Sequence, residues 1–332
     1  NHKNHVKIRQ IAEARANAAT ERETTQQDFD EVMKSFTDPI PMGSNTSHTR
    51  HQERVAPSGD ESEFFMGMVH TPVKIEVAMQ IPLAKAAVDK EWNKLETKGA
   101  WIYDEVQERS WVLTNRKRPN KKLYFGSVRD LCHQKHSERT DLPEEYKGRV
   151  IFQGNLMRDE SGFYAIMSEQ GTSASHMAGA KLLDGLARMP GMTGHDSDAR
   201  SAYTQVRLAE AARLLPGDDE LETWVTIPRH KWPAGWSSKY TDPVVPLRLN
   251  LYGHPLAGLI WEKFLEEKLF SCGFEKVPNW ECMYMHKKEK VFLSCYVDDL
   301  KMAGDEKGVE NCWKALGKVI DLDPPQNLSG NS

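Results

Sequence analysis

The chain has 332 residues, of which 39% are hydrophobic and 28% charged, and its formal net charge is −4 at pH 7. These values are typical of a folded protein with one large domain or two ordinary ones. No apolar run approaches the roughly 18–20 residues of a membrane-spanning helix, and the polar, charged N-terminus predicts no secretory signal. The five cysteines lie far apart, which favours reduced thiols. We therefore expect an intracellular, cytoplasmic protein without a membrane partner.

The acidic average hides one basic stretch. Residues Arg109 to Arg158 contain 12 Lys or Arg and five Asp or Glu, a local net charge of +7. Such a stretch can neutralise the phosphates of a nucleic acid. The alternative is a basic face that contacts only solvent.

The first residues do not predict a packed domain. Residues 1–35 are charged and Ala-rich, which predicts partial helix, and residues 37–62 have the Pro, Gly, Ser and Thr content of a linker. We therefore expect 1–62 to be a disordered or partly helical upstream segment and the globular part to begin near Phe64.

Three helices and several strands are predicted beyond this segment. Pro82 suits a first helical turn and Gly99 a helix end, with Leu83, Ala87, Val88, Trp92 and Leu95 on the apolar face. Further helices are predicted at about 174–188, with Met177 on its apolar side, and 255–271. Strands are predicted at 149–153, 203–208, 223–227, 244–249 and 291–297. This irregular order of helices and strands indicates an α+β fold.

The clearest chemical motif is a pair of aspartates between two apolar runs. The β-prone run Val291–Val297 ends on Asp298 and Asp299, and apolar residues resume before Gly304. This pattern predicts a β-hairpin with both acids at its tip. Adjacent carboxylates repel one another and become useful when a divalent cation neutralises them. The alternative is an ordinary turn rich in Asp.

The tetrapeptide Tyr-Val-Asp-Asp at 296–299 resembles the signature of reverse transcriptases. Over roughly residues 80–323 the chain resembles the reverse transcriptase of Ty1/copia-type retrotransposons. Five blocks occur in the order of that family: 91–101, 146–150 (YKGRV), 195–204 (HDSDARSAYT), 250–261 (NLYGHPLAGLIW) and 273–304. It departs from the family at 151–154 and at 255–256, where polar groups are lost.

The resemblance implies the fingers and palm of a right-hand polymerase, with an antiparallel palm sheet backed by helices. The expected limits are 63–323 for this region: fingers at about 80–170, palm at about 171–305 and the start of a thumb at about 306–323. A disordered tail would follow at 324–332. The thumb would be largely missing, so we expect a fragment of a longer polyprotein.

The resemblance also implies an activity and partners. The activity is RNA-directed DNA synthesis, a phosphoryl transfer from a dNTP to a primer 3′-hydroxyl. The partners would be an RNA or DNA template with its primer, dNTPs, and the integrase, protease and RNase H segments of the same polyprotein, in a virus-like particle. Two other interpretations remain open: a catalytically inactive remnant that still binds nucleic acid, and an RNA-templated RNA polymerase, which the Tyr-Val-Asp-Asp box disfavours.

Metal-binding residues follow from the same resemblance. Asp198 and Asp298 would be bridging ligands of two Mg²⁺ ions, or of Mn²⁺, with Asp299 in support and the carbonyl oxygen of Ala199 as a further ligand. Asp196 is a rival of Asp198, because alternation along a strand puts both on one face. The resemblance selects Asp198.

Nucleotide-binding residues are expected at seven positions: Lys147, Arg149, Arg200, Ser201, Tyr203, Tyr252 and Gly253. In the family, an aromatic residue at the position of Tyr203 packs under the incoming sugar and excludes a 2′-hydroxyl; the alternative is a core aromatic. Lys147 and Arg149 share a strand face and suit phosphate oxygens, or are ordinary surface cations.

Two other residue groups have weaker claims to a site. Cys132, His133 and His136 lack the second pair of a zinc site, so we expect a surface cluster. The tryptophans at 224, 232 and 236 suit either base stacking or a local core.

Overall fold

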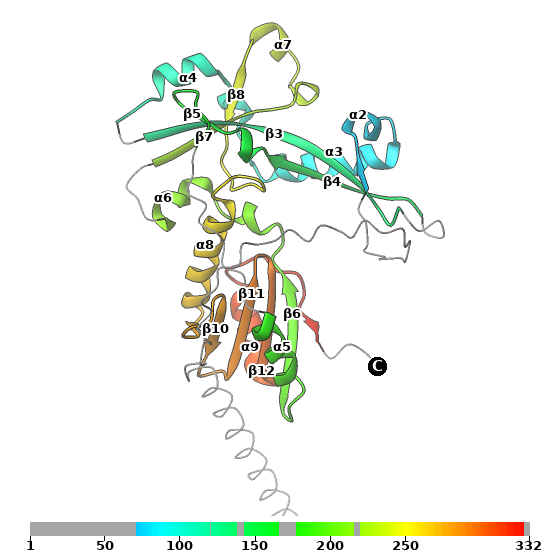
Figure 1. Cartoon of the computed structure of the whole chain (residues 1–332), viewed down its shortest axis with the longest axis vertical. Coiled ribbons are helices and arrows are strands. Elements are labelled where there is room, and N and C mark those ends of the chain that lie inside the picture. Colours follow the sequence, from blue (N-terminus) through cyan, green and yellow to red (C-terminus); the bar gives the residue numbers. More distant parts are fainter. Residues whose placement is uncertain (1–70, 120, 138–142, 166–176, 216–219, 329–332) are drawn as a thin grey trace, which may run out of the picture. The chain divides into compact units, whose positions relative to one another are not determined.

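A computed structural model describes residues 71–119, 121–137, 143–165, 177–215 and 220–328 (Figure 1). The chain divides into two compact units, one of residues 57–172 and 201–266 and one of residues 173–200 and 267–332. We name them the seven-stranded unit and the six-stranded unit after their sheets. The expected upstream segment at 1–62 lies outside the described residues.

The seven-stranded unit is built around one long strand, β3 (Lys121–Lys135). The sheet has the order β1-β3-β7-β8-β2, and β4 and β5 also pair with β3. The pairing of β3 with β7 is parallel and the other pairings are antiparallel. The other strands are β1 (Thr71–Val73), β2 (Gln107–Glu108), β4 (Glu145–Phe152), β5 (Arg158–Asp159), β7 (Glu220–Thr226) and β8 (Pro243–Pro246).

Helix α3 (Pro82–Thr97) covers part of this sheet, with proline at its start as predicted. It buries Ala84, Val88, Trp92 and Leu95, whereas Leu83, which was expected on the apolar face, is 59% exposed. Gly148 of β4 explains the close approach of the helix, because a Cβ atom there would lie 2.5 Å from the backbone oxygen of Ala87.

Short helices complete the seven-stranded unit. They are α2 (Ile75–Ala78), η1 (Tyr103–Glu105), α4 (Arg109–Asn115), η2 (Gly154–Leu156), η3 (Ala202–Gln205), η4 (Leu208–Glu210), α6 (Ala211–Leu214), η5 (Arg229–Lys231) and α7 (Trp236–Lys239). The strand predicted at 203–208 is therefore wrong. The amide and the hydroxyl of Thr204 both donate to the carbonyl of Ser201. These local hydrogen bonds form a turn in place of the hydrogen bonds that a strand would make to a neighbouring strand. Helix α8 (Ala257–Ser271) crosses the division between the units.

The six-stranded unit has an antiparallel sheet with the order β13-β6-β12-β11-β10-β9. Its strands are β6 (Met192–Asp198), β9 (Glu275–Lys276), β10 (Met283–His286), β11 (Val291–Tyr296), β12 (Asp299–Asp305) and β13 (Gln326–Asn327). The sheet has a strand where the sequence predicted a disordered tail from 324, because Gln326 and Asn327 pair with Asp196 and His195.

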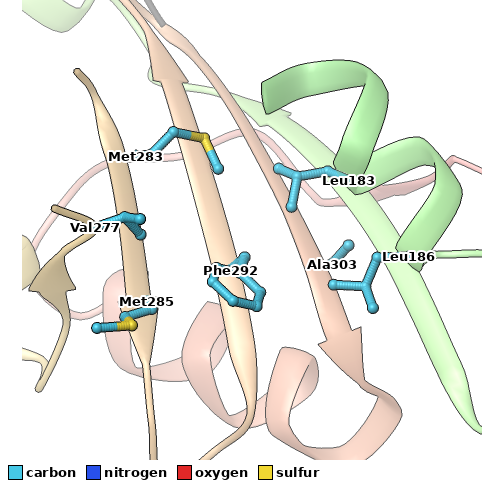
Figure 2. Close-up of a cluster of buried hydrophobic side chains, with 7 residues drawn as sticks. All are labelled: Leu183, Leu186, Val277, Met283, Met285, Phe292 and Ala303. Atoms are coloured by element: carbon cyan, nitrogen blue, oxygen red, sulfur yellow. The ribbon is translucent and has the colours of Figure 1, made fainter. Parts of the chain in front are cut away.

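Helices lie on both faces of the six-stranded sheet. Leu183 and Leu186 of α5 (Met177–Leu186) pack on Phe292 and Ala303 (Figure 2). Helix α9 (Glu306–Leu316) covers the other face, since a Cβ atom on its Gly308 would meet the side chain of Val291, the residue before Phe292 on β11. Met177, expected on the apolar side of α5, is 71% exposed.

The fold thus confirms the α+β class, with one mixed and one antiparallel sheet. Its division differs from the expected one, because residues 201–266 belong with 57–172 and α9 packs on the six-stranded sheet. Trp224 and Trp236 are buried, which assigns them to the local core. Within the described residues, no helix is both long enough and apolar enough to cross a membrane.

Candidate active site

The predicted hairpin is present at the end of the six-stranded sheet. Strands β11 and β12 pair from Val291 with Gly304 to Tyr296 with Asp299, so that Val297 and Asp298 form a two-residue turn. Val297 has a φ of 57°, which a β-branched residue rarely adopts. Positive φ at the first central residue suits a tight hairpin turn, and it projects Asp298 from the tip at the cost of local strain.

The register of β6 brings Asp198 to this hairpin. Asp198 is the partner of Asp299 in the ladder between β6 and β12. The amide of Ala199 donates to the carbonyl oxygen of Asp298 at 2.8 Å. Three carboxylates from two separated parts of the sequence therefore meet at one end of the sheet, with the Ala199 backbone beside them.

The electrostatics of this cluster show that it has excess negative charge. Loss of water around its carboxyl, a hydrogen bond with Asp198 and the charges of Asp198, Asp298 and Asp196 raise the pKa of Asp299 from 3.8 to about 6. Close carboxyls raise one another's affinity for protons because their negative charges repel. A divalent cation bound between them would reduce this repulsion.

The donor chemistry fits a hard cation such as Mg²⁺, which prefers carboxylate oxygens. The side chains do not yet surround a cation: within the described residues, no group of three or more His, Cys, Asp or Glu is arranged to hold a metal ion. A metal ion would therefore have to draw the carboxyls of Asp198, Asp298 and Asp299 together.

The structure separates Asp198 from its rival Asp196. Both are exposed and both lie on one face of β6, but Asp196 pairs with Lys301 of β12, one step farther from the hairpin tip. Two residues along a strand correspond to about 6.5 Å. Lys301 is itself bound to Asp184 of α5, with Nζ 2.9 Å from the carboxylate. Asp196 therefore has a cation opposite it, and Asp198 has a carboxylate.

A C-terminal segment holds the end of β6 from the other side, and the sequence did not indicate it. The amide of Asp323 donates to the carbonyl of Asp198, and the Ser197 hydroxyl donates to the carbonyl of Asp323. Arg200, expected to bind nucleotide, donates its Nε–H to Asp323 at 2.6 Å and has an Nη 3.5 Å from Asp321. These ion pairs raise the pKa of Arg200. Spaced acids in the run Asp321-Leu322-Asp323 were the signal available in the sequence.

The seven-stranded unit brings together most of the other predicted residues. The rings of Tyr203 and Tyr252 have centroids 4.3 Å apart, and the Arg149 guanidinium carbon lies 5.8 Å from the Tyr252 ring centroid. Lys147 is on the same face of β4 as Arg149. Burial, followed by the charge of Arg149, lowers the pKa of Lys147.

Gly253 fixes Tyr252 against the end of β4. Gly253 has a φ of 88°, and a Cβ atom there would lie 2.0 Å from the Phe152 carbonyl oxygen. The amide of Phe152 donates to the Tyr252 carbonyl at 2.7 Å. Gly253 is therefore required by close packing of backbone on backbone.

Ser201, with a φ of 51°, is the first residue of the segment 201–266 of the same unit.

The predicted residues thus form two sets, each within one unit. The carboxylate set is Asp198, Asp298 and Asp299 with Ala199 and Arg200, and the aromatic and basic set is Lys147, Arg149, Tyr203, Tyr252 and Gly253, with Ser201 at the start of its segment. Cys132, which the sequence placed in a surface cluster with His133 and His136, is instead buried in β3.

Comparisons with known proteins give little sequence similarity. No family model matches the chain, and no curated protein matches it. Among solved structures, it is similar to apo telomerase from Candida tropicalis truncated from its C-terminal domain, with a TM-score of 0.39, 10% identity and coverage of 75% of this chain and 56% of that one. It is also similar to telomerase from Candida albicans in complex with a fragment of telomeric RNA, with a TM-score of 0.38, 8% identity and coverage of 75% and 47%.

These comparisons correct the family expected from the sequence. The chain spans about half the length of the telomerase chains that it resembles. Neither a family model nor a curated protein links it to Ty1/copia-type retrotransposons. The assignment to that family is therefore wrong, and the expected integrase, protease and RNase H partners have no support. Likeness at this level carries no argument about function, which depends on the site geometry.

Proposed function

We propose that the chain is the catalytic part of an RNA-directed DNA polymerase that transfers a nucleotide from a dNTP to a primer 3′-hydroxyl. The observation that carries the proposal is the pairing of Asp198 with Asp299 at a strained hairpin tip that presents Asp298. A structural turn does not require three mutually repelling carboxylates. The Tyr-Val-Asp-Asp sequence of this tip adds support, because it is the box typical of reverse transcriptases.

The proposed metal ligands are Asp198 and Asp298, with Asp299 and the Ala199 carbonyl in support. Two Mg²⁺ ions, when bound, supply stabilisation of the attacking and leaving oxygens of the phosphoryl transfer. The chain itself holds the ligands in place: the β6–β12 ladder sets Asp198 beside Asp299, and the Val297 turn keeps Asp298 at the tip. Asp323 and Ser197 hold β6 from its other edge.

The proposed nucleotide contacts are a separate part of the hypothesis. The ring of Tyr203 contacts that of Tyr252 at a tilt of 48°, and Arg149 lies over Tyr252, so an aromatic surface lies next to a guanidinium. Such a pair suits a sugar or base on the ring and a phosphate on the cation. We propose that Tyr203 excludes the 2′-hydroxyl of ribonucleotides and that Lys147 and Arg149 bind the triphosphate.

Primer extension on an RNA template tests the activity. The full chain with Mg²⁺ and dNTPs should extend the primer, and Asp298→Asn and Asp198→Asn should each abolish extension. Asp196→Asn is the matched control, since it removes the same charge from the same face of β6. The proposed ligand set fails if the Asp196 variant loses as much activity as the Asp198 variant.

Further measurements separate the alternatives. Binding of Mn²⁺, measured by calorimetry, should weaken in the Asp198 and Asp298 variants whether or not extension is detected. Metal binding and RNA binding without any extension would favour the non-catalytic remnant. Equal use of ribonucleotides by the wild-type chain would favour an RNA polymerase, whereas Tyr203→Ala should increase ribonucleotide use if the tyrosine excludes the 2′-hydroxyl.

A further inference from the structure

The seven-stranded unit contains a cavity of about 320 Å³ that the proposed function does not use. Its walls come from five parts of the chain: the end of η1, the end of α4, the start of η4 with the residue before it, strand β7, and the end of β8 with the segment that follows it. Volumes of this order are typical of sites for small ligands. The lining residues that matter for its chemistry are Arg116, Arg207, Arg248, Glu105, Glu222 and Trp224.

Three arginines dominate the charge of this cavity. Arg207 and Arg248 are exposed and Arg116 is half-buried. Within the described chain, none of the three guanidinium groups has an ion-pair partner. The guanidinium of Arg248 lies beside Gly99, where a Cβ atom would be 3.5 Å from one of its Nη atoms, an ordinary contact distance.

The two acidic residues of the lining do not neutralise these arginines. Glu222 accepts a hydrogen bond from the Trp224 indole at 2.6 Å and is paired with buried Lys121, so its charge is already compensated. Glu105 is an exposed residue of η1. Three guanidinium charges therefore face at most one uncompensated carboxylate.

Arg116 provides an independent sign of a missing ligand. It is the C-terminal cap of α4, and its guanidinium carbon lies 5.9 Å from the Trp224 ring centroid. The Nε atom of Arg116 is buried without a hydrogen-bond partner. A buried donor without an acceptor is unfavourable, and the Trp224 ring holds this guanidinium in place. An anion in the cavity would supply the acceptor that the chain lacks.

We propose that this cavity binds a phosphate group, with Arg116, Arg207 and Arg248 as its ligands. Guanidinium groups present planar pairs of donors that match phosphate oxygens, and a group of three suits a ligand with more than one negative charge. The phosphate comes either from a free nucleotide or pyrophosphate or from the backbone of a single-stranded RNA. The proposal does not rest on the carboxylate site.

Binding measurements on the full chain at one fixed salt concentration test this site, because phosphate contacts depend strongly on salt. The probes are inorganic pyrophosphate, followed by calorimetry, and a labelled RNA hexamer without a terminal triphosphate, followed by fluorescence anisotropy. Arg248→Gln and Arg116→Gln should each weaken binding of at least one probe by about tenfold, the loss expected for one charge-assisted contact. Arg129→Gln is the control, because Arg129 is an exposed arginine of β3 outside the cavity.

The two probes also identify the source of the phosphate. A loss for pyrophosphate alone indicates a free phosphate compound, and a loss for RNA indicates a nucleic-acid strand. The Arg248 variant alters an exposed side chain and remains informative if the Arg116 variant does not fold. The proposal is overturned if neither probe is weakened more than in the Arg129 control. An Asp298→Asn chain should bind both probes as the wild type does, which separates this site from the proposed polymerase centre.

Discussion

Replacement of Asp299 by asparagine should make the protein more stable at neutral pH while it removes a proposed metal-supporting group. In the folded chain, the pKa of Asp299 is raised from 3.8 to about 6, first by loss of water around its carboxyl and then by Asp198. A carboxyl with a raised pKa binds its proton more tightly in the folded state than in the unfolded state. Its contribution to stability is therefore fully present below pH 3.8 and is lost as the pH rises to about 6.

The size of the effect follows from that shift. At about 1.4 kcal/mol per pKa unit, a rise from 3.8 to about 6 corresponds to about 3 kcal/mol. More than a third of Asp299 is exposed to solvent, so screening by water reduces this value to about 1 kcal/mol. Asp299→Asn should recover that amount at pH 7.5, because asparagine carries no charge, and almost none at pH 3, where the wild-type carboxyl is largely protonated in both the folded and the unfolded chain.

Thermal unfolding at the two pH values measures the difference. A gain of about 1 kcal/mol corresponds to roughly 2–4 °C for a folded region of this size. Glu281→Gln, which alters an exposed carboxylate of the same unit, is the control and should change neither value. A variant that is no more stable than the wild type at pH 7.5, or one equally stabilised at both pH values, would refute the reasoning.

Three further changes test the packing around the site by thermal or urea unfolding. Phe292→Ala should lower the unfolding free energy by about 3–5 kcal/mol, because Phe292 is fully buried, whereas Phe163→Ala, at a side chain 72% exposed, should change it little. Val297→Gly should be about 1 kcal/mol more stable than Val297→Ala, since only glycine adopts positive φ without penalty; equal stabilities would argue against strain at the turn. Gly253→Ala should cost about 3 kcal/mol or more, because its Cβ would lie 2.0 Å from a backbone oxygen, against about 1 kcal/mol at Gly162, which has open space. Similar losses at both glycines would contradict the close packing.

Local patterns in the sequence were sufficient for the helices and the hairpin. Proline at 82 and glycine at 99 delimit α3, and the helix predicted at 255–271 contains α8. The apolar run that ends on Asp298 and Asp299 predicted β11, its turn and β12. These signals depend on neighbouring residues, because caps, turns and side-chain alternation involve only a few positions of the chain.

The same local reasoning failed where contacts between distant residues decide the conformation. Residues 203–208 have the composition of a strand, but the hydrogen bonds between Thr204 and Ser201 make the first part helical. Leu83 lies on the apolar face expected from the sequence, yet α3 buries Ala84 and leaves Leu83 exposed. No pattern within a segment reports which part of another segment will cover it.

The carboxylate site shows most clearly which features the sequence determined and which only the tertiary structure determined. The sequence by itself determined the pair Asp298-Asp299 and its hairpin. It left Asp196 and Asp198 equivalent on their strand, apart from a family resemblance whose family proved wrong. Only the register of β6 against β12 places Asp198, and not Asp196, opposite Asp299, and only the return of residues 321–323 to β6 brings Asp323 and Arg200 together. Register and strand order depend on pairing between segments about a hundred residues apart, which tertiary packing alone establishes.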